Sequence, residues 1–548
     1  MKDNRRQLYL LLFILALVVN FAGIGLDFFT DDPGLYASIS KNLIYRKEFW
    51  QLFTYNQDWL DKPHFPFWAA IVSFKLFGIS VWAYRLPALL FFLLGLRYTY
   101  LFTKKFYNED IAWIAVLIVS TSLHVMMSNT DVRAEPYLLA LVVGSIYHIS
   151  KLDERFKVGD LLLAALLTAC AIMTKGIFVI VAIYGALFIQ YVFKHKFLQL
   201  FRFKWILLVL LTGVFILPEL YALYSQFDLH PEKVVFGRRN VSGIKWFFWD
   251  SQFGRFVNNG PITRQSGDVF FYLHTLLWAF APWCLVFYYA IFKSVKNIAQ
   301  RKPLPEYYSL GGGLLLLLLF SLSRFQLPFY TNTVFPLFAI VTAPYCYNQL
   351  SKTGNYFRTI GLGIYLIILP LAVLALHYLS APGGTLVLTI EAVALVFIVA
   401  VIIKKTEQQL RLFLLACAVV LFADLYLNTV FYKLVISYRG QIKAARYVNQ
   451  NIPSATPIYN LSAENNVFQF YTARPVGYMA TEDFKSFSPP QGAIMFANQK
   501  AIDSLRKAQL NFKEIKAFSD YHSETVTMDF INKATRSAAL DSVYLISK

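Results

Sequence analysis

Long apolar segments alternate with short polar loops along most of the chain. A helix that crosses about 30 Å of hydrocarbon needs roughly 17 to 25 residues, and we expect such helices at 8–26, 82–103, 110–127, 132–150, 159–173, 176–193, 204–223, 269–292, 307–323, 330–349, 357–378, 384–403 and 411–433. The pattern therefore predicts a polytopic α-helical membrane protein with about 13 transmembrane helices.

The first apolar segment, "LYLLLFILALVVNFAGIGL", follows the basic stretch "MKDNRR". A secretory signal peptide also has a basic start, but its apolar core is shorter and ends in a small-residue cleavage site of the A-x-A kind. This segment has neither property. We expect it to be a retained membrane anchor.

Composition supports the membrane class. Of the 548 residues, 57% are hydrophobic and 15% are charged, whereas soluble domains average roughly 45–50% and 25%. The formal charge of +19 comes largely from loops such as "TKKFYNED" and "KHKFLQLFRFK", which the positive-inside rule places in the cytoplasm. We therefore expect a cytoplasmic N-terminus and, with an odd number of spans, a C-terminus on the outer side of the membrane, which is the periplasm if the protein lies in a bacterial inner membrane; no nucleic-acid partner is expected.

Three stretches should lie off the membrane on the outer side: 27–81, 224–268 and the tail 434–548. The tail opens with a helix-like segment and continues with short β-rich runs. "KAIDSLRKAQLNFKEIKAFSD" then predicts an amphipathic helix leading into a strand, and "SVYLISK" predicts a final strand. We predict a small periplasmic α/β domain at 434–548 after a transmembrane domain at 1–433.

Polar residues gather in the first outer stretch. Asp31, Asp32, Asp61, Lys62 and His64 lie between two amphipathic segments, "PGLYASISKNL" and "PFWAAIVSFKLFG". Helices of this kind lie along the membrane interface and would hold the intervening acids near the lipid head groups. The alternative for the paired aspartates is a helix N-terminal cap.

The order of these motifs resembles a known family. "TDDPGLYASISKNL" and "WLDKPHFPFWAAIVSFKLFGISVWAYRLPALL" are similar to the first periplasmic loop and second span of the GT-C membrane glycosyltransferases. The similar branch contains the lipid A aminoarabinose transferase and is related to the protein O-mannosyltransferases. Asp61, Lys62 and Pro63 match its D/E-K-P-P motif, with His64 in place of the second proline.

Later segments continue the resemblance. "NTDVRAEPYLLALVVG", "AIMTKGIFVIV", "FFYLHTLLWAFAPW" and "FSLSRFQLPFYTNTVFPLFAI" match further elements of the family, so that the similarity covers about residues 25–345. The resemblance implies a GT-C fold with an outer C-terminal domain. It also implies an inverting transfer of a sugar from a polyprenyl (undecaprenyl) phosphate to a lipid A, glycan or protein acceptor at the outer face of the inner membrane.

The chemistry of such a transfer sets physical demands. Cleavage between an anomeric carbon and phosphate passes through an oxocarbenium-like transition state, and an acidic side chain can activate the acceptor. Phosphate is a good leaving group because its second pKa is about 6, so no general acid is required. Cations that stabilise the developing phosphate charge are required instead.

We therefore assign Asp32 as the catalytic acidic residue, acting as a base or orienting the acceptor, with Asp131 and Glu135 as a second acidic group. Glu135 could orient the acceptor, bind a cation or be structural. The expected substrate-binding residues are Asp31, Asp61, Lys62, Arg85, Arg133, Lys175, Arg324 and Tyr330. The alternatives are a snorkelling interface lysine for Lys62, a lipid head-group contact for Arg85 and a local ion pair for Arg133.

Neither a metal nor a disulfide is expected. The chain has no clear DxD motif or His cluster, although carboxylates leave a bound Mg²⁺ or Mn²⁺ open. Its four cysteines all fall inside apolar runs without CxxC spacing.

Two other classes compete with the enzyme. A polytopic transporter or carrier flippase would also carry intramembrane charges, but we find no inverted pair of hydrophobic halves. A scaffold that displays the tail domain would make changes at Asp32 and Lys62 silent.

Overall fold

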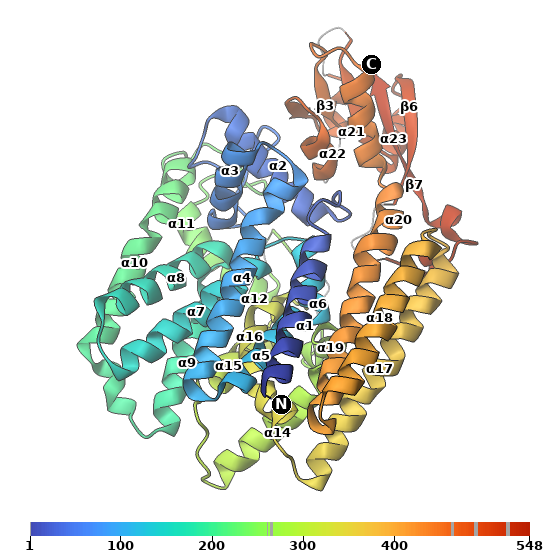
Figure 1. The fold of residues 1–548 in the computed structure, drawn as a ribbon. Coiled ribbons are helices and arrows are strands. Elements are labelled where there is room, and N and C mark those ends of the chain that lie inside the picture. The colour runs from blue at the N-terminus through green and yellow to red at the C-terminus, as the bar shows by residue number, and fades with distance from the viewer. Residues whose placement is uncertain (1, 260, 264–266, 462–464, 487–491, 522–525) are drawn as a thin grey trace.

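The computed structural model describes residues 2–259, 261–263, 267–461, 465–486, 492–521 and 526–548. A bundle of helices forms the body of the molecule, and a small sheet domain lies at one end of it (Figure 1). The N-terminus lies at the opposite end of the bundle.

Each predicted apolar stretch contains helix. The bundle helices are α1 (Lys2–Ala22), α4 (Val81–Phe106), α5 (Glu109–Ser120), α6 (Leu123–Thr130), α7 (Glu135–Glu154), α8 (Val158–Lys175), α9 (Ile180–Phe193), α10 (Phe203–Leu223), α13 (Phe271–Ala279), α14 (Cys284–Ala299), α15 (Tyr308–Leu322), α16 (Phe335–Tyr347), α17 (Lys352–Ser380), α18 (Thr385–Lys405) and α19 (Gln408–Tyr426).

Fewer helices are long enough to cross a membrane than the apolar pattern predicts. Among the described residues, 7 helices are long and apolar enough to cross a membrane, or up to 8 if α5 and α6, which meet at a bend of 53°, form one broken span. Several other apolar helices are short or interrupted. The membrane-protein class is therefore confirmed, whereas the predicted count of 13 is not.

Short helical pieces connect the bundle helices. They are η1 (Ile177–Val179), η2 (Phe197–Phe201), η3 (Tyr224–Asp228), α11 (Gly243–Lys245), η4 (Trp246–Asp250), α12 (Ser251–Val257), η5 (Pro328–Val334), η6 (Leu427–Phe431) and α20 (Tyr432–Ser437). Several of them interrupt or extend longer helices, as η5 does before α16.

The first outer stretch folds into two helices joined by a hairpin. They are α2 (Asp31–Arg46) and α3 (Phe65–Phe77), with β1 (Phe53–Thr54) and β2 (Gln57–Asp58) between them. Both amphipathic helices were predicted. They lie at the end of the bundle that carries the sheet domain (Figure 1).

The C-terminal domain is an α/β fold. Its elements are α21 (Gly440–Asn451), β3 (Ile458–Asn460), α22 (Asn466–Tyr471), β4 (Val476–Tyr478), η7 (Thr481–Phe484), β5 (Ile494–Asn498), α23 (Gln499–Lys507), β6 (Lys513–Asp520), α24 (Met528–Ile531), η8 (Arg536–Ala539) and β7 (Asp541–Ser547). The strand order is β4-β3-β5-β7-β6.

Helices cover both faces of this sheet. One core cluster joins α21 and α22 to one face through Val448, Phe468 and Phe496. A second cluster joins α23 to the other face through Ile502 and Met495. The predicted helix, its following strand and the final strand are all present, while the domain boundary at 433/434 stays a prediction.

Candidate active site

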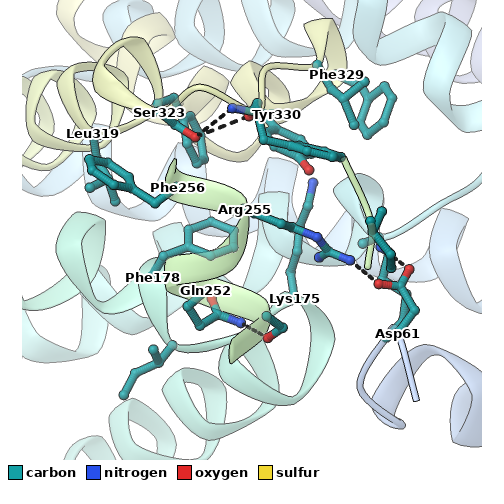
Figure 2. A pocket seen from close by; sticks show the side chains of 18 of the residues that line it. Asp61, Lys175, Phe178, Gln252, Arg255, Phe256, Leu319, Ser323, Phe329 and Tyr330 are labelled. Atoms are coloured by element: carbon teal, nitrogen blue, oxygen red, sulfur yellow. Dashed lines mark hydrogen bonds and ion pairs between the residues drawn. The ribbon is translucent and has the colours of Figure 1, made fainter. Parts of the chain in front are cut away.

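A cavity of about 590 Å³ lies where the outer stretches meet the bundle. Its walls come from the first turn of α2, the loop before α3, the junctions of α6 with α7 and of α8 with η1, the segment η4–α12, and the turn from α15 to η5. Figure 2 shows part of its lining from close by. Segments far apart in the sequence therefore share one site.

Charged side chains gather along one part of the cavity. The acids are Asp32, Asp61 and Glu135, and the cations are Lys62, Arg133, Lys175 and Arg255. Each acid pairs with at least one cation. The cations outnumber the acids in this lining, so the pocket suits an anionic ligand.

Asp32 lies in the first turn of α2 and faces Arg133. Its Oδ2 accepts a hydrogen bond of 2.5 Å from Nη1 of Arg133. Arg133 also pairs with Asp131, at 3.0 Å and 3.1 Å, and Thr30 donates to Asp131. The Asp32 side chain is 38% exposed, whereas Glu135 is 1% exposed and Asp61 12%. Asp32 is therefore the cavity acid best placed to reach a substrate.

Asp61 holds two cations side by side. It pairs with Arg255, and Nζ of Lys62 lies 2.6 Å from its Oδ2. Figure 2 shows the Arg255 side chain directed from α12 toward Asp61. Burial alone would raise the pKa of Asp61, but Arg255 and Lys62 outweigh it and lower the pKa below its usual range. Asp61 thus stays ionised at neutral pH and keeps both cations at the cavity wall.

Lys175 ends α8 and pairs with Glu135 at the start of α7. Its ammonium lies 4.0 Å from the centre of the Tyr330 ring, a cation–π contact, and Figure 2 shows it pointing toward that ring. Gly176 follows with a φ of 106°, and a Cβ there would lie 2.4 Å from Nε2 of Gln252. The positive φ favours glycine at this position of the T-K-G motif, and any side chain there would also displace the Gln252 amide.

Apolar side chains form the rest of the cavity. They include Phe178, Val181, Phe256, Leu319 and Phe320. An apolar wall beside a cluster of cations is the lining that an amphiphilic anion, with a charged head and a hydrocarbon part, would require.

Two predicted site residues, Asp131 and Asp31, are not among the residues that line the cavity. Asp131 ends α6 and holds Arg133 rather than lining the pocket. Asp31 pairs with Arg439 of the C-terminal part at 2.8 Å. Neither side chain lines the cavity, and the roles of Asp131 in catalysis and of Asp31 in substrate binding stay predictions.

Two predicted phosphate ligands are placed elsewhere. Arg85 is 0% exposed and donates to the carbonyls of Thr130, Gly23, Ile24 and Leu26, so it caps the ends of two helical segments. Arg324 is exposed on the turn after α15 and is absent from the cavity lining. The sequence identified both as cations near the outer face, but only the fold decides where such side chains point.

The cavity contains one cation that the sequence analysis missed. Arg255 lies on α12 within the outer stretch 224–268. Arg255 is a basic residue on the predicted outer side, where the positive-inside tendency makes cations uncommon, and that signal could have identified it. His64 does not line the cavity: it is buried, and its ring contacts Glu219 at 2.9 Å and the Trp50 carbonyl at 3.0 Å.

The described residues hold neither a cluster of metal ligands nor a disulfide. Among the described residues, no group of three or more His, Cys, Asp and Glu side chains is arranged to hold a metal ion. The expectation of no obligatory metal stays a prediction. All four cysteines are buried and unpaired.

Comparison with known proteins gives this arrangement its context. The family described as dolichyl-phosphate-mannose-protein mannosyltransferase matches residues 61–221. The crystal structure of ArnT from Cupriavidus metallidurans, bound to undecaprenyl phosphate, superposes with a TM-score of 0.76 at 16% identity, over 98% of this chain and 97% of that one. The chain has the GT-C fold. The apo form of the same Cupriavidus metallidurans ArnT superposes on this chain with a TM-score of 0.74.

Sequence relatives agree with this fold. A protein of Aquifex aeolicus is 25% identical over 507 residues, which is 90% of this chain and 91% of the relative. An undecaprenyl phosphate-alpha-4-amino-4-deoxy-L-arabinose arabinosyl transferase of Edwardsiella ictaluri is 23% identical over 64% of this chain and 61% of its own length. The resemblance to GT-C membrane glycosyltransferases, predicted from the motifs, is confirmed, and the protein is a glycosyltransferase of this type.

Proposed function

We propose that this protein moves a sugar from a polyprenyl-phosphate carrier, of the undecaprenyl type, to an acceptor at the outer face of the bacterial inner membrane. The observation that carries the proposal is the cavity itself. It places a half-exposed carboxylate, four cations and an apolar wall within one space of about 590 Å³. Those are the groups that activation of an acceptor, stabilisation of a phosphate and accommodation of a lipid chain would need.

The donor phosphate binds at Lys62 and Arg255, with Lys175 beside them. In the free protein, Lys62 and Arg255 are held by Asp61, so both are fixed before the phosphate arrives. Arginine offers two parallel donors to phosphate, and lysine offers a point charge. As the glycosidic bond to phosphate breaks, these cations stabilise the negative charge that develops on the leaving oxygen.

Asp32 orients the acceptor and accepts its proton when the acceptor is a hydroxyl. Its partner Arg133 holds it on the cavity side of α2. The acceptor classes that the resemblance implies are lipid A, a glycan and a protein. The relative named for transfer of 4-amino-4-deoxy-L-arabinose from undecaprenyl phosphate supports a donor of this class, and we take lipid A as the first acceptor to test.

The deciding experiment uses purified full-length protein in lipid with a panel of radiolabelled undecaprenyl-phosphate sugars and lipid A. We expect one donor to be consumed, and Asp32→Asn to reduce kcat by roughly 100-fold or more, the range of a lost general base. Asp250→Asn is the matched control, because Asp250 lies on the outer segment η4 but does not line the cavity.

Native turnover in Asp32→Asn would remove Asp32 from this role. If no donor reacts but labelled carrier crosses the bilayer, the protein is a flippase and the proposed transfer is wrong.

A further inference from the structure

The two adjacent acids at the start of α2 have separate partners. Asp32 pairs with Arg133 inside the cavity, whereas Asp31 pairs with Arg439. Successive helical residues are turned by about 100° from each other, so the two carboxylates face different neighbours. Arg439 lies between α20 and α21, where the chain enters the C-terminal domain.

Arg439 is itself held firmly. Its side chain is 1% exposed, and Nη1 donates to the Tyr521 carbonyl at 2.9 Å. The backbone on both sides is fixed as well, because the Tyr521 amide donates to the Tyr438 carbonyl at 2.8 Å and the Gly440 amide donates to Asp520 at 2.6 Å. The guanidinium is therefore a rigid partner for Asp31.

The rest of α2 lies along the same domain. Ser38 donates to the Asn466 carbonyl at 2.8 Å, and Lys41 donates to the Gln469 and Phe470 carbonyls at 3.1 Å and 2.9 Å. A Cβ at Gly34 would lie 2.7 Å from a methyl group of Val467, so α2 and α22 are in close contact. The C-terminal domain thus sets the direction of α2, and Arg439 meets its first turn.

Local interactions leave that first turn weakly held. Thr30 is the N-cap residue, but its side chain makes no capping hydrogen bond and donates to Asp131 instead. An uncapped N-terminus has free backbone N–H groups and tends to fray. Tertiary contacts such as the Asp31–Arg439 pair must therefore hold the turn that carries Asp32.

We propose that Arg439 is a positioning residue for the transfer reaction: by holding Asp31 it fixes the first turn of α2 and thereby the direction of Asp32. This proposal rests on the proposed function of Asp32. Displacement of a reacting group by about 1 Å can slow a reaction on the order of 100-fold. The C-terminal domain then takes part in catalysis without contacting the substrate, through one partly buried ion pair.

The test compares kcat and donor KM of Arg439→Gln, Arg439→Lys and Arg446→Gln in the full chain. We expect Arg439→Gln to lower kcat about tenfold or more with donor KM within about twofold, because geometry and not donor binding is disturbed. Arg439→Lys keeps the charge and should recover part of kcat. Arg446→Gln removes a second Arg–Asp pair of the same interface, with Asp27 at 2.7 Å and the Arg446 side chain 55% exposed, and should keep native kcat.

A double variant separates positioning from general destabilisation. In an Asp32→Asn background, Arg439→Gln should lower kcat no further, because the group that it positions is already lost. If Asp32→Asn is inactive while Arg439→Gln has native kcat, the positioning role is wrong and the proposed function stands. If Asp32→Asn keeps native activity, the role of Asp32 and the positioning role of Arg439 both fail, while the proposed sugar transfer itself stands. If Arg439→Gln does not fold, the Arg439→Lys variant tests the proposal instead. Native kcat and donor KM in Arg439→Lys would show that the guanidinium geometry of Arg439 does not position Asp32.

Discussion

At the scale of single residues, charge and position in the sequence identify candidates, but the fold selects among them. Lys62 and Arg85 are both basic residues close to the outer face in motifs of the same family, yet one lines the cavity and the other caps helix ends. The difference lies in what surrounds each side chain. Arg85 has unpaired carbonyls at helix ends within reach, and a buried guanidinium binds such acceptors rather than remain unsatisfied.

Arg255 offers the sharpest prediction at this scale. Arg255→Gln removes a charged donor from the proposed phosphate site and should lower kcat/KM for the donor by about 10- to 100-fold, the equivalent of roughly 1.5–3 kcal/mol for a hydrogen bond to a charged group. Arg255→Lys should lose less, because it keeps the charge without the planar fork. Steady-state kinetics with varied donor would measure both.

Arg239→Gln serves as the control for Arg255, because Arg239 is exposed in the same outer stretch and does not line the cavity. Equal losses in the Arg239 and Arg255 variants would point to bulk electrostatics and against a specific phosphate contact.

At the scale of elements, α2 connects the cavity to the C-terminal domain. The sequence shows that α2 is amphipathic, but its supposedly polar side is largely covered: Ser38, Lys41 and Asn42 are buried. Lys41 donates to three carbonyls at the end of α22, those of Gln469, Phe470 and Thr472. An ammonium at the C-terminus of a helix also complements the helix dipole. A polar face that looks solvent-exposed in the sequence is thus an interface between domains.

The contribution of Lys41 to the stability of this interface should depend on pH. Burial lowers the pKa of Lys41 to about 7, whereas an unfolded lysine has a pKa of about 10.4. Between these values the unfolded chain binds a proton that the folded chain does not, so the contribution of Lys41 to stability rises with pH over that window and is constant below it. The thermal midpoint of the native protein relative to Lys41→Met should therefore increase from pH 7 to pH 10.

Lys443→Met is the control for this measurement, because Lys443 is an exposed lysine of the neighbouring helix α21. Parallel pH profiles for the native chain and Lys41→Met, with no change in their difference, would show that Lys41 does not titrate in this range.

At the scale of the whole molecule, α2, whose first turn lines the cavity, lies at the same end of the bundle as the sheet domain, and the N-terminus lies at the other (Figure 1). The predicted orientation puts the cavity end in the periplasm. That side is also where a carrier-linked sugar would meet an envelope acceptor, so topology and proposed function are linked.

Cysteine labelling tests the orientation. Lys500→Cys would place a thiol on exposed α23, and Lys302→Cys would place one on the exposed loop between α14 and α15. With a membrane-impermeant maleimide, we expect Lys500→Cys to react in intact spheroplasts and Lys302→Cys only after lysis. The native chain, whose four cysteines are buried, gives the background. The reverse pattern would invert the topology and place the cavity in the cytoplasm.

By itself, the sequence determined the membrane class, the positions of the apolar helices, the two interfacial helices, the α/β tail and the family resemblance. These features depend on local periodicity and on motifs contiguous in the chain. Only the tertiary structure decided that Arg255 joins Lys62 at Asp61, that Arg85 and Arg324 lie outside the cavity, and that Asp31 contacts the C-terminal domain. Those outcomes depend on the packing of segments up to 408 positions apart and on which buried polar atoms each side chain can satisfy, and neither is encoded in local pattern.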